Sequence, residues 1–516
     1  MENIIAPLIF AGIPAVYLLF KLGPDSFVPP FTGRGFSGFL GFATLAACAS
    51  LAFGIVLRLE GPAMAGLMAL WGLAFLAFLF ASQVRPAAAD PNVLRGSRVQ
   101  VATKGRSGNG RHAIEIAGVE VPRQLEAQHF LFTGTTGTGK TQAINSMLRT
   151  IRARGHRAVI ADPGGGFFSR FGQAGDTMFN PFDGRTVDWS PFADIENDYD
   201  CERIAKAIVP DGVGDGMQWH HYSQSFVAAV LRSMHASGER SIKRLLYWLT
   251  TAEPKELQEM LAGTPAAALC AKGNERMLAS TRAILSSYVG VFPYLADEGQ
   301  FSVREWVRNS LGEGWLFVTY RDDQMGMLRG LVATMLELAI VEGLSLSEDQ
   351  ERGLWFVMDE VDSLGKVTSL RAGLTKLRKY GGRCVLGLQT VAQLRTTYGR
   401  DEAQTLMANC STKLVLRAGD HETARSMEEE LGQQEIVRMT TGTSETAPNM
   451  LAGNQGSSSF STNQQYTRQA AVMASEIMGL QNLHGYLKMP GETIHRVQLD
   501  YVSMPEVQPA FQAPRK

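Results

Sequence analysis

The residues with the clearest chemical potential lie at 134–141, where the sequence reads Gly-Thr-Thr-Gly-Thr-Gly-Lys-Thr. This spacing matches G-x-x-x-x-G-K-[ST], the pattern of a loop whose backbone N–H groups surround phosphate oxygens. Lys140 is expected to reach the β- and γ-phosphates, and the Thr141 hydroxyl is expected to bind a magnesium ion. The phosphate-binding residues that the motif predicts are Gly134, Thr135, Thr136, Gly137, Thr138, Gly139, Lys140 and Thr141.

Two acidic residues end an apolar run at 354–360. Such a run is typical of a buried parallel strand, and open α/β sheets bind their ligands at the carboxyl edge of the strands. We therefore expect Asp359 to hold magnesium through water. Glu360 is expected to polarise the attacking water as a general base.

A third strand pattern, 383–388, ends at Gln389, which could sense the γ-phosphate or position water; a loop-capping role is the alternative. Between the second and third strands, residues 369–380 form a basic helical stretch that contains Arg378. Two interpretations of this stretch stay open. It is either a solvated basic face or the source of an arginine finger that enters a neighbouring subunit's site.

The elements around these motifs alternate between strand and helix patterns, with further strands predicted at 158–161, 315–320 and 412–417. This alternation predicts an α/β fold with a mostly parallel sheet. Residues 187–299 show helical periodicity alone and predict an inserted all-α domain. The nucleotide-binding domain is then assigned to 89–186 and 300–516, with a flexible polar loop at 440–467.

The first 89 residues differ in composition from the rest, because they contain only seven of the 99 charged residues. Three stretches without charge, 4–20, 36–57 and 62–84, predict a transmembrane anchor over 1–88, with either two or three spans. The positive-inside rule places the side after 84 in the cytoplasm, given the basic residues that follow: Arg85, Arg95, Arg98, Lys104, Arg106 and Arg111.

The overall composition excludes several classes of protein. With 49 basic and 50 acidic residues the chain has no strongly charged tail, and 45% hydrophobic residues exclude a disordered chain. The five cysteines are scattered, which argues against a zinc site or a disulfide framework and favours a reducing compartment.

Taken in order, these motifs resemble those of the type IV coupling proteins of bacterial conjugation, of the TrwB/TraD type. The resemblance rests on the phosphate loop, Asp162-Pro163, Asn180-Pro181-Phe182-Asp183, Met358-Asp359-Glu360 and Gly387-Leu388-Gln389. It implies a RecA-like core and a hexameric ring with a central channel. Lys140, Glu360, Gln389 and Arg378 then match the family's catalytic positions, Arg378 as the proposed arginine finger.

The resemblance further implies ATP and Mg2+ as cofactors and a place in the bacterial inner membrane. The implied activity is DNA-dependent ATP hydrolysis that drives transfer of single-stranded plasmid DNA. The implied partners are single- and double-stranded DNA, relaxase and relaxosome proteins, inner-membrane secretion channel components and further copies of the chain. Two alternatives remain: a nucleotide-switched docking receptor, and a coupling ATPase for protein effectors. A chromosome translocase is a more distant one.

Overall fold

The computed structural model describes residues 93–102, 113–212, 216–309, 312, 314–361, 363–445, 458–491 and 493–514. The chain divides into two compact units, Met1–Arg85 and Pro86–Lys516, and the three uncharged stretches of the proposed anchor lie outside the described residues. Among the residues that are described, no helix has the length and apolar character needed to cross a bilayer.

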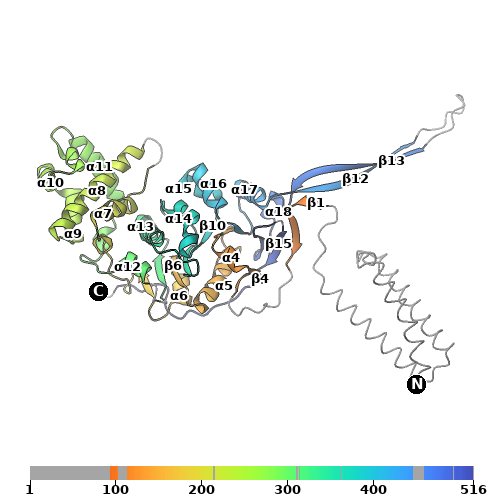
Figure 1. Cartoon of the computed structure of the whole chain (residues 1–516), viewed down its shortest axis with the longest axis horizontal. Helices are drawn as coiled ribbons and strands as arrows, with labels where there is room; N and C mark the ends of the chain where they lie inside the picture. Colours follow the sequence, from red (N-terminus) through yellow and green to blue (C-terminus); the bar gives the residue numbers. More distant parts are fainter. Residues whose placement is uncertain are drawn as a thin grey trace, which may run out of the picture. The chain divides into compact units, whose positions relative to one another are not determined.

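A ten-stranded sheet forms the centre of the described unit (Figure 1). Seven consecutive strands, from β11 to β7, are parallel, and β14 joins them antiparallel to β11. The α/β prediction with a mostly parallel sheet is confirmed. In spatial order the strands are β2 (Arg98–Val101), β15 (Thr493–Gln498), β14 (His484–Lys488), β11 (Thr412–Val415), β5 (Phe130–Thr133), β10 (Gly382–Leu388), β9 (Leu354–Met358), β6 (Arg157–Pro163), β8 (Leu316–Tyr320) and β7 (Thr177–Phe179).

Helices cover both faces of this sheet, because the parallel strands are apolar on both sides. Within β5, Phe130 and Phe132 contribute to one core while Leu131 contributes to the other, as the two-residue period of a strand requires. The first core includes α5 (Lys140–Ala153) and α6 (Gly166–Phe171). The second includes α13 (Met325–Gly343), α14 (Leu370–Lys376), α15 (Val391–Tyr398), α16 (Arg400–Ala408) and α17 (His421–Leu431).

Between β7 and β8 the described residues form helices and one isolated bridge, Trp189 to Phe301, where the chain leaves and returns. The helices here are η2 (Pro191–Asp194), α7 (Asp198–Ile208), α8 (Met217–Ser237), α9 (Ile242–Leu246), η4 (Tyr247–Thr251), α10 (Pro254–Met260), η5 (Pro265–Cys270), α11 (Glu275–Val289), η6 (Phe292–Tyr294) and α12 (Val303–Arg308). Residues from the longer ones pack into the same core as α13.

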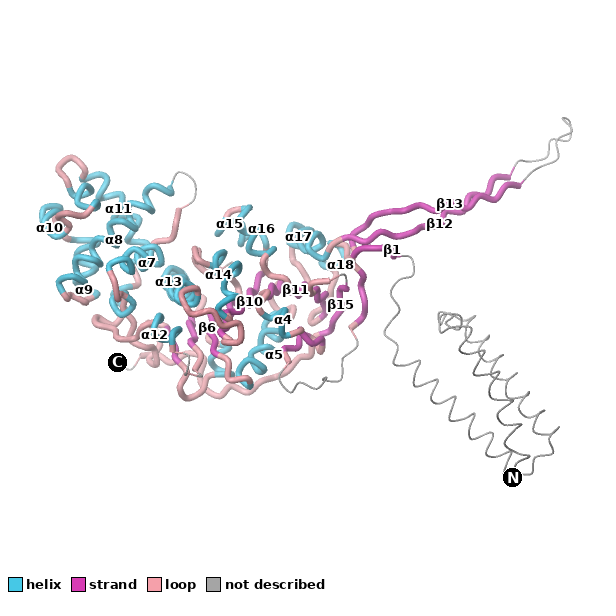
Figure 2. Tube along the Cα trace, viewed as in Figure 1, coloured by secondary structure: helices cyan, strands magenta, loops and turns pink. Residues whose placement is uncertain are grey.

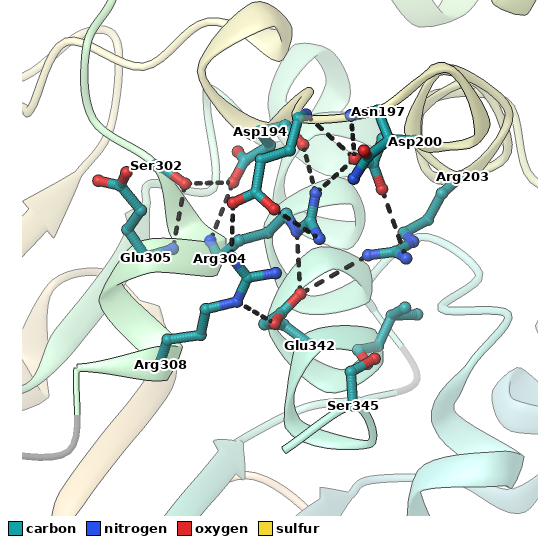
Figure 3. A network of polar contacts seen from close by, with 12 residues as sticks. Asp194, Asn197, Asp200, Arg203, Ser302, Arg304, Glu305, Arg308, Glu342 and Ser345 are labelled. Carbon is teal, nitrogen blue, oxygen red and sulfur yellow. Dashed lines mark hydrogen bonds and ion pairs between the residues drawn. The ribbon is translucent and has the colours of Figure 1, made fainter. Parts of the chain in front are cut away.

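A charge network centred on the buried Arg304 and Glu342 joins α7 and α12 to α13 (Figure 3). The Arg304 guanidinium, on α12, lies 2.9 Å from Glu342 of α13 and 2.7 Å from Asp200 of α7. Glu342 also accepts a hydrogen bond from Arg308 at 2.6 Å. Each charge in this set has an opposite partner, as burial of charged groups demands. The network therefore fixes α7 against the two helices that flank β8.

The prediction of a flexible loop over 440–467 is wrong where the chain is described. Residues 440–445 and 458–467 belong to β12 (Gln433–Glu445) and β13 (Ser458–Ala470), a long antiparallel ribbon that pairs at its base with β1 (Val93–Gly96) (Figure 2). The polar composition was misleading because both faces of a two-stranded ribbon meet water. Thr440, Thr443, Thr462 and Tyr466 supply the strand propensity.

Several short strands carried too little pattern to be predicted. They are β1, β2, β7, β14 and the hairpin formed by β3 (Ile114–Ile116) and β4 (Val119–Val121). Each is three to five residues long, which is too short for two-residue alternation to stand out.

Candidate functional site

The loop at 134–139 connects β5 to α5 and is held from both neighbouring strands. The Gly134 N–H donates to Leu388 O at the end of β10, and the Thr135 N–H donates to Arg417 O just after β11. Gly137 and Gly139 have φ of 76° and 118°, a region that residues with a Cβ seldom adopt. These glycines turn the chain so that backbone N–H groups at the start of α5 are available for an anion.

Lys140 begins α5, and its ammonium group donates a hydrogen bond to Gly134 O within the loop. The side chain is only 6% exposed. A buried lysine that already spans the loop is positioned to exchange this carbonyl for phosphate oxygens. The phosphate role predicted for Lys140 therefore fits the geometry.

Asp359 follows β9 and meets Thr141, the second residue of α5. The Thr141 hydroxyl lies 3.3 Å from Asp359 Oδ2, while Oδ1 is buried with no normal hydrogen-bond partner among the described residues. Burial is the main reason that the pKa of Asp359 is raised to about 6, although Lys140 opposes the shift. A hard divalent cation prefers such oxygen ligands and would stabilise the ionised carboxylate.

Glu360 occupies a strained backbone position, with φ of 65° in the left-handed region. The turn is possible because Gly387 of β10 lies close by: a Cβ there would stand 2.5 Å from Asp359 Oδ1. The strain is held by the bond from Val361 N–H to Gly387 O at 2.9 Å. Backbone strain of this kind persists only where the surroundings impose it, and it aims the Glu360 carboxylate.

Gln389 connects this carboxylate to the phosphate loop. Its Nε2 donates to Glu360 Oε1 at 2.5 Å, and its Oε1 accepts from the Thr136 hydroxyl at 3.5 Å. The structure thus brings Lys140, Thr141, Asp359, Glu360 and Gln389 to one edge of the sheet, as the sequence predicted. A polar chain from the loop through Gln389 to Glu360 is what a phosphate sensor requires.

Arg378 lies elsewhere. It is exposed in η7 (Leu377–Tyr380), immediately before β10 begins at Gly382, whereas Glu360 and Gln389 follow the carboxyl ends of β9 and β10. The seven residues of β10 separate the two edges by roughly 20 Å at ~3.3 Å per residue. Arg378 therefore cannot reach the phosphate loop of its own chain. Its exposure leaves both earlier interpretations open, a solvated basic face or a residue that enters the site of another copy.

Two further polar groups near this edge had no role assigned from the sequence. Asp162, at the end of β6, accepts hydrogen bonds from the N–H groups of Phe167 and Phe168, and burial raises its pKa to about 7. Burial, and then the charges of Glu360 and Asp359, raise the pKa of the Tyr320 hydroxyl at the end of β8. Each lies at or just after the end of a predicted strand, and Asp162 also belongs to the Asp162-Pro163 pair on which the resemblance rests.

The arrangement provides anion-binding N–H groups, a lysine, a hydroxyl–carboxylate pair for a cation and an aimed carboxylate. Comparison with known protein families then shows to which family the chain belongs. Residues 113–500 match the model described as the type IV secretion-system coupling protein DNA-binding domain. The chain belongs to the type IV coupling protein family. Coupling protein TraD of Escherichia coli K12 is 30% identical over 407 residues, which cover 77% of this chain and 56% of TraD.

Solved structures support the assignment of the chain to this family. The bacterial conjugative coupling protein TrwBdeltaN70 is 34% identical, with a TM-score of 0.75, and the match covers 83% of this chain and 98% of that one. TrwB has also been solved with ADP and Mg2+. That structure is 35% identical to this chain, with a TM-score of 0.73, and the match covers 83% of this chain and 98% of that one. The chain spans a little over half the length of the curated TraD and TraG coupling relatives that it matches.

Proposed function

We propose that the chain is a membrane-anchored coupling ATPase of conjugation, which hydrolyses ATP to move single-stranded plasmid DNA toward a type IV secretion channel. The observation that carries the proposal is the joint placement of Lys140, Thr141, Asp359, Glu360 and Gln389 around the phosphate loop. Support comes from TrwB, which has been solved with non-hydrolysable analogues of GTP and ATP.

In this proposal ATP binds with its phosphates over the loop 134–141 and the start of α5. Thr141 and Asp359 hold Mg2+, which supplies positive charge to the phosphate oxygens. Lys140 leaves Gly134 O and binds phosphate. Glu360 is the general base that takes a proton from the attacking water, and Gln389 reports the terminal phosphate to Glu360 through the contact it already makes.

The proposal extends to assembly. Because Arg378 cannot reach the site of its own chain, it acts as an arginine finger in the site of a neighbouring copy. A ring of six RecA-like domains would give every site an arginine from its neighbour in this way, since head-to-tail interfaces close into rings.

The helical segment 187–299 forms the all-α domain, and 1–88 forms the inner-membrane anchor with the ATPase domain in the cytoplasm. Relaxosome proteins and channel components are the proposed partners.

The test is ATP hydrolysis by the full-length protein in detergent, with and without single- and double-stranded DNA. We expect DNA to raise the rate several-fold and Lys140→Ala to abolish it, because phosphate binding is lost. DNA contacts made through phosphates would also weaken steeply with salt. An assembled ring that hydrolyses ATP at the same rate with and without DNA contradicts the translocation proposal.

A further inference from the structure

The direction in which a nucleotide would lie across the loop follows from the order of the strands. The loop is fastened to β10 on one side, at Leu388 O, and to β11 on the other, at Arg417 O. Glu360 and Gln389, which would face the terminal phosphate, lie on the β10 side. Because a triphosphate chain is linear, the ribose and base must extend to the other side, toward β11, β14 and β15.

On that side the chain packs directly against the loop. The Leu483 N–H, just before β14, donates to Thr138 O at 2.9 Å, and the Leu499 N–H, just after β15, donates to Leu483 O at 2.7 Å. A Cβ on Gly139 would meet the Leu483 side chain at 2.9 Å and the Leu499 side chain at 3.0 Å. The loop therefore has an apolar boundary where the base would approach.

Tyr501 is exposed and belongs to the chain segment that forms this boundary. It follows Leu499, whose side chain lies beside Gly139, by two residues. Its neighbour Val502 is held by a bond from its N–H to Gln142 Oε1 at 3.2 Å, and Gln142 directly follows Thr141. The Tyr501 side chain is nonetheless 72% exposed.

The exposure of Tyr501 contrasts with how firmly its segment is fixed. Farther along, the Val507 N–H donates to Ser169 O at 2.7 Å, and the Gln512 N–H donates to Asp183 Oδ2 at 2.9 Å. A large aromatic ring on a fixed backbone, left in water beside a phosphate site, is a pre-positioned stacking surface. Stacking would bury its apolar face without further cost in backbone order.

We propose that Tyr501 is the residue on which the base of the bound nucleotide stacks. This inference rests on the proposed function, since it requires the phosphates to occupy the loop. Stacking uses the face of the ring system, which adenine and guanine share, rather than the hydrogen-bonding edges that distinguish them. Tyr501 therefore strengthens ATP and GTP binding alike and makes no contact with the phosphates.

The test is calorimetric titration of the full-length protein in detergent with three ligands: non-hydrolysable analogues of ATP and GTP, and inorganic tripolyphosphate, which has no base. We expect Tyr501→Ala to weaken both analogues by about tenfold and to leave tripolyphosphate unchanged. Tyr501→Phe should bind all three as the wild type does. Phe460→Ala is the matched control, because Phe460 is also 72% exposed but lies on the ribbon.

The outcomes separate this inference from the proposed function. If Tyr501→Ala, with an unchanged melting temperature, binds the analogues like the wild type, the stacking role is overturned and the phosphate site stands. An equal loss for tripolyphosphate also overturns it, because the defect would then lie in the loop. If the wild type binds none of the three ligands, the proposed function itself fails.

Discussion

The buried carboxylates at the two edges of the central sheet have opposite surroundings. At the carboxyl edge Asp359 has a buried oxygen without a normal hydrogen-bond partner among the described residues, and Glu360 holds a strained backbone. At the amino edge Glu126 is fully buried, yet it accepts two hydrogen bonds from Arg154, at 2.9 and 3.0 Å, and faces Arg383 at 3.5 Å. The buried carboxylate at the carboxyl edge therefore keeps an oxygen without such a partner, whereas both oxygens of the buried carboxylate at the amino edge are paired within the chain.

This difference follows from the direction of parallel strands. All seven parallel strands from β11 to β7 bring their carboxyl ends to one edge, where the loops and the N-terminus of α5 can accept an anion and its cation. At the amino ends of β5 and β10, the described residues instead include the ion pairs of Glu126 with Arg154 and Arg383. What the amino edge does present to the outside is Arg378, which is exposed. The carboxyl edge thus holds the groups of the candidate site and the amino edge holds a buried ion-pair cluster, while the contribution of Arg378 to a neighbouring copy is our proposal.

The largest effect is expected from Glu360→Gln at the carboxyl edge. It should lower the rate of ATP hydrolysis by roughly 10²- to 10⁴-fold, as loss of a general base does. Nucleotide affinity and melting temperature should stay near those of the wild type, because glutamine has the same size and can keep the contact of this side chain with Gln389. Single-turnover hydrolysis and calorimetric titration measure the two quantities. A loss of affinity equal to the loss of rate would contradict the role.

Arg378→Ala is expected to lower the rate by about 10³-fold in the assembled protein. Nucleotide affinity should change little, because the chain's own loop does not contact Arg378. Arg371→Ala is the matched control, since Arg371 is exposed on α14 in the same connection. Equal rates for the two variants would show that this stretch is only a solvated basic face.

Glu126→Ala tests the amino edge. It leaves the buried Arg383 and the partly buried Arg154 without their shared partner, and we expect a loss of about 3 kcal/mol in the free energy of unfolding. Arg123→Ala is the control, because its ion pair with Glu351 is exposed and should contribute less than about 1 kcal/mol. Urea unfolding measures both. A loss for Glu126→Ala no larger than for Arg123→Ala would remove the contrast between buried and exposed pairs.

A smaller effect, dependent on pH, is expected from His129, which precedes β5 and accepts a hydrogen bond from the Cys384 N–H at 3.0 Å. Burial lowers its pKa from 6.5 to about 4. The unfolded chain takes up this proton first, so the stabilising effect is complete above pH 6.5 and is lost as pH falls toward 4. Between pH 7 and 5 the loss should be about 2 kcal/mol.

His129→Asn should remove this part of the pH dependence. Asparagine tolerates the left-handed backbone at this position, where φ is 64°. His156 remains in both proteins as a common contribution, since burial lowers its pKa to about 4 as well. Urea unfolding at the two pH values gives the comparison. Identical pH dependence in the wild type and the variant would contradict the role of His129.

The sequence allowed the carboxyl edge to be predicted because motif and strand patterns coincide there. Lys140, Thr141, Asp359, Glu360 and Gln389 each follow a recognisable strand or loop, and parallel strands must bring them together. What could not be predicted depends on long-range packing. The strain at Glu360 is imposed by Gly387, 27 residues away in sequence.

The ribbon of β12 and β13 could not be predicted from the sequence for a different reason. Its residues had the composition of a loop, and only the pairing of β12 with β13 makes them strands. Tyr501 was hidden in another way, because its position beside the loop depends on the hydrogen bond from its neighbour Val502 to Gln142, 360 residues earlier. Neither pairing leaves a local pattern in the sequence. Composition and periodicity report local order, whereas these features arise from contacts between distant segments.

The central claim is that the carboxyl edge of one chain and the amino edge of another form a single active site. Mixing full-length Glu360→Gln and Arg378→Ala proteins tests it most directly. In a randomly mixed ring, about a quarter of the interfaces combine an intact Glu360 with a neighbour's intact Arg378. We predict that ATP hydrolysis, nearly absent in each variant alone, returns on mixing. If the mixed assembly stays as inactive as its components, the two edges do not share a site.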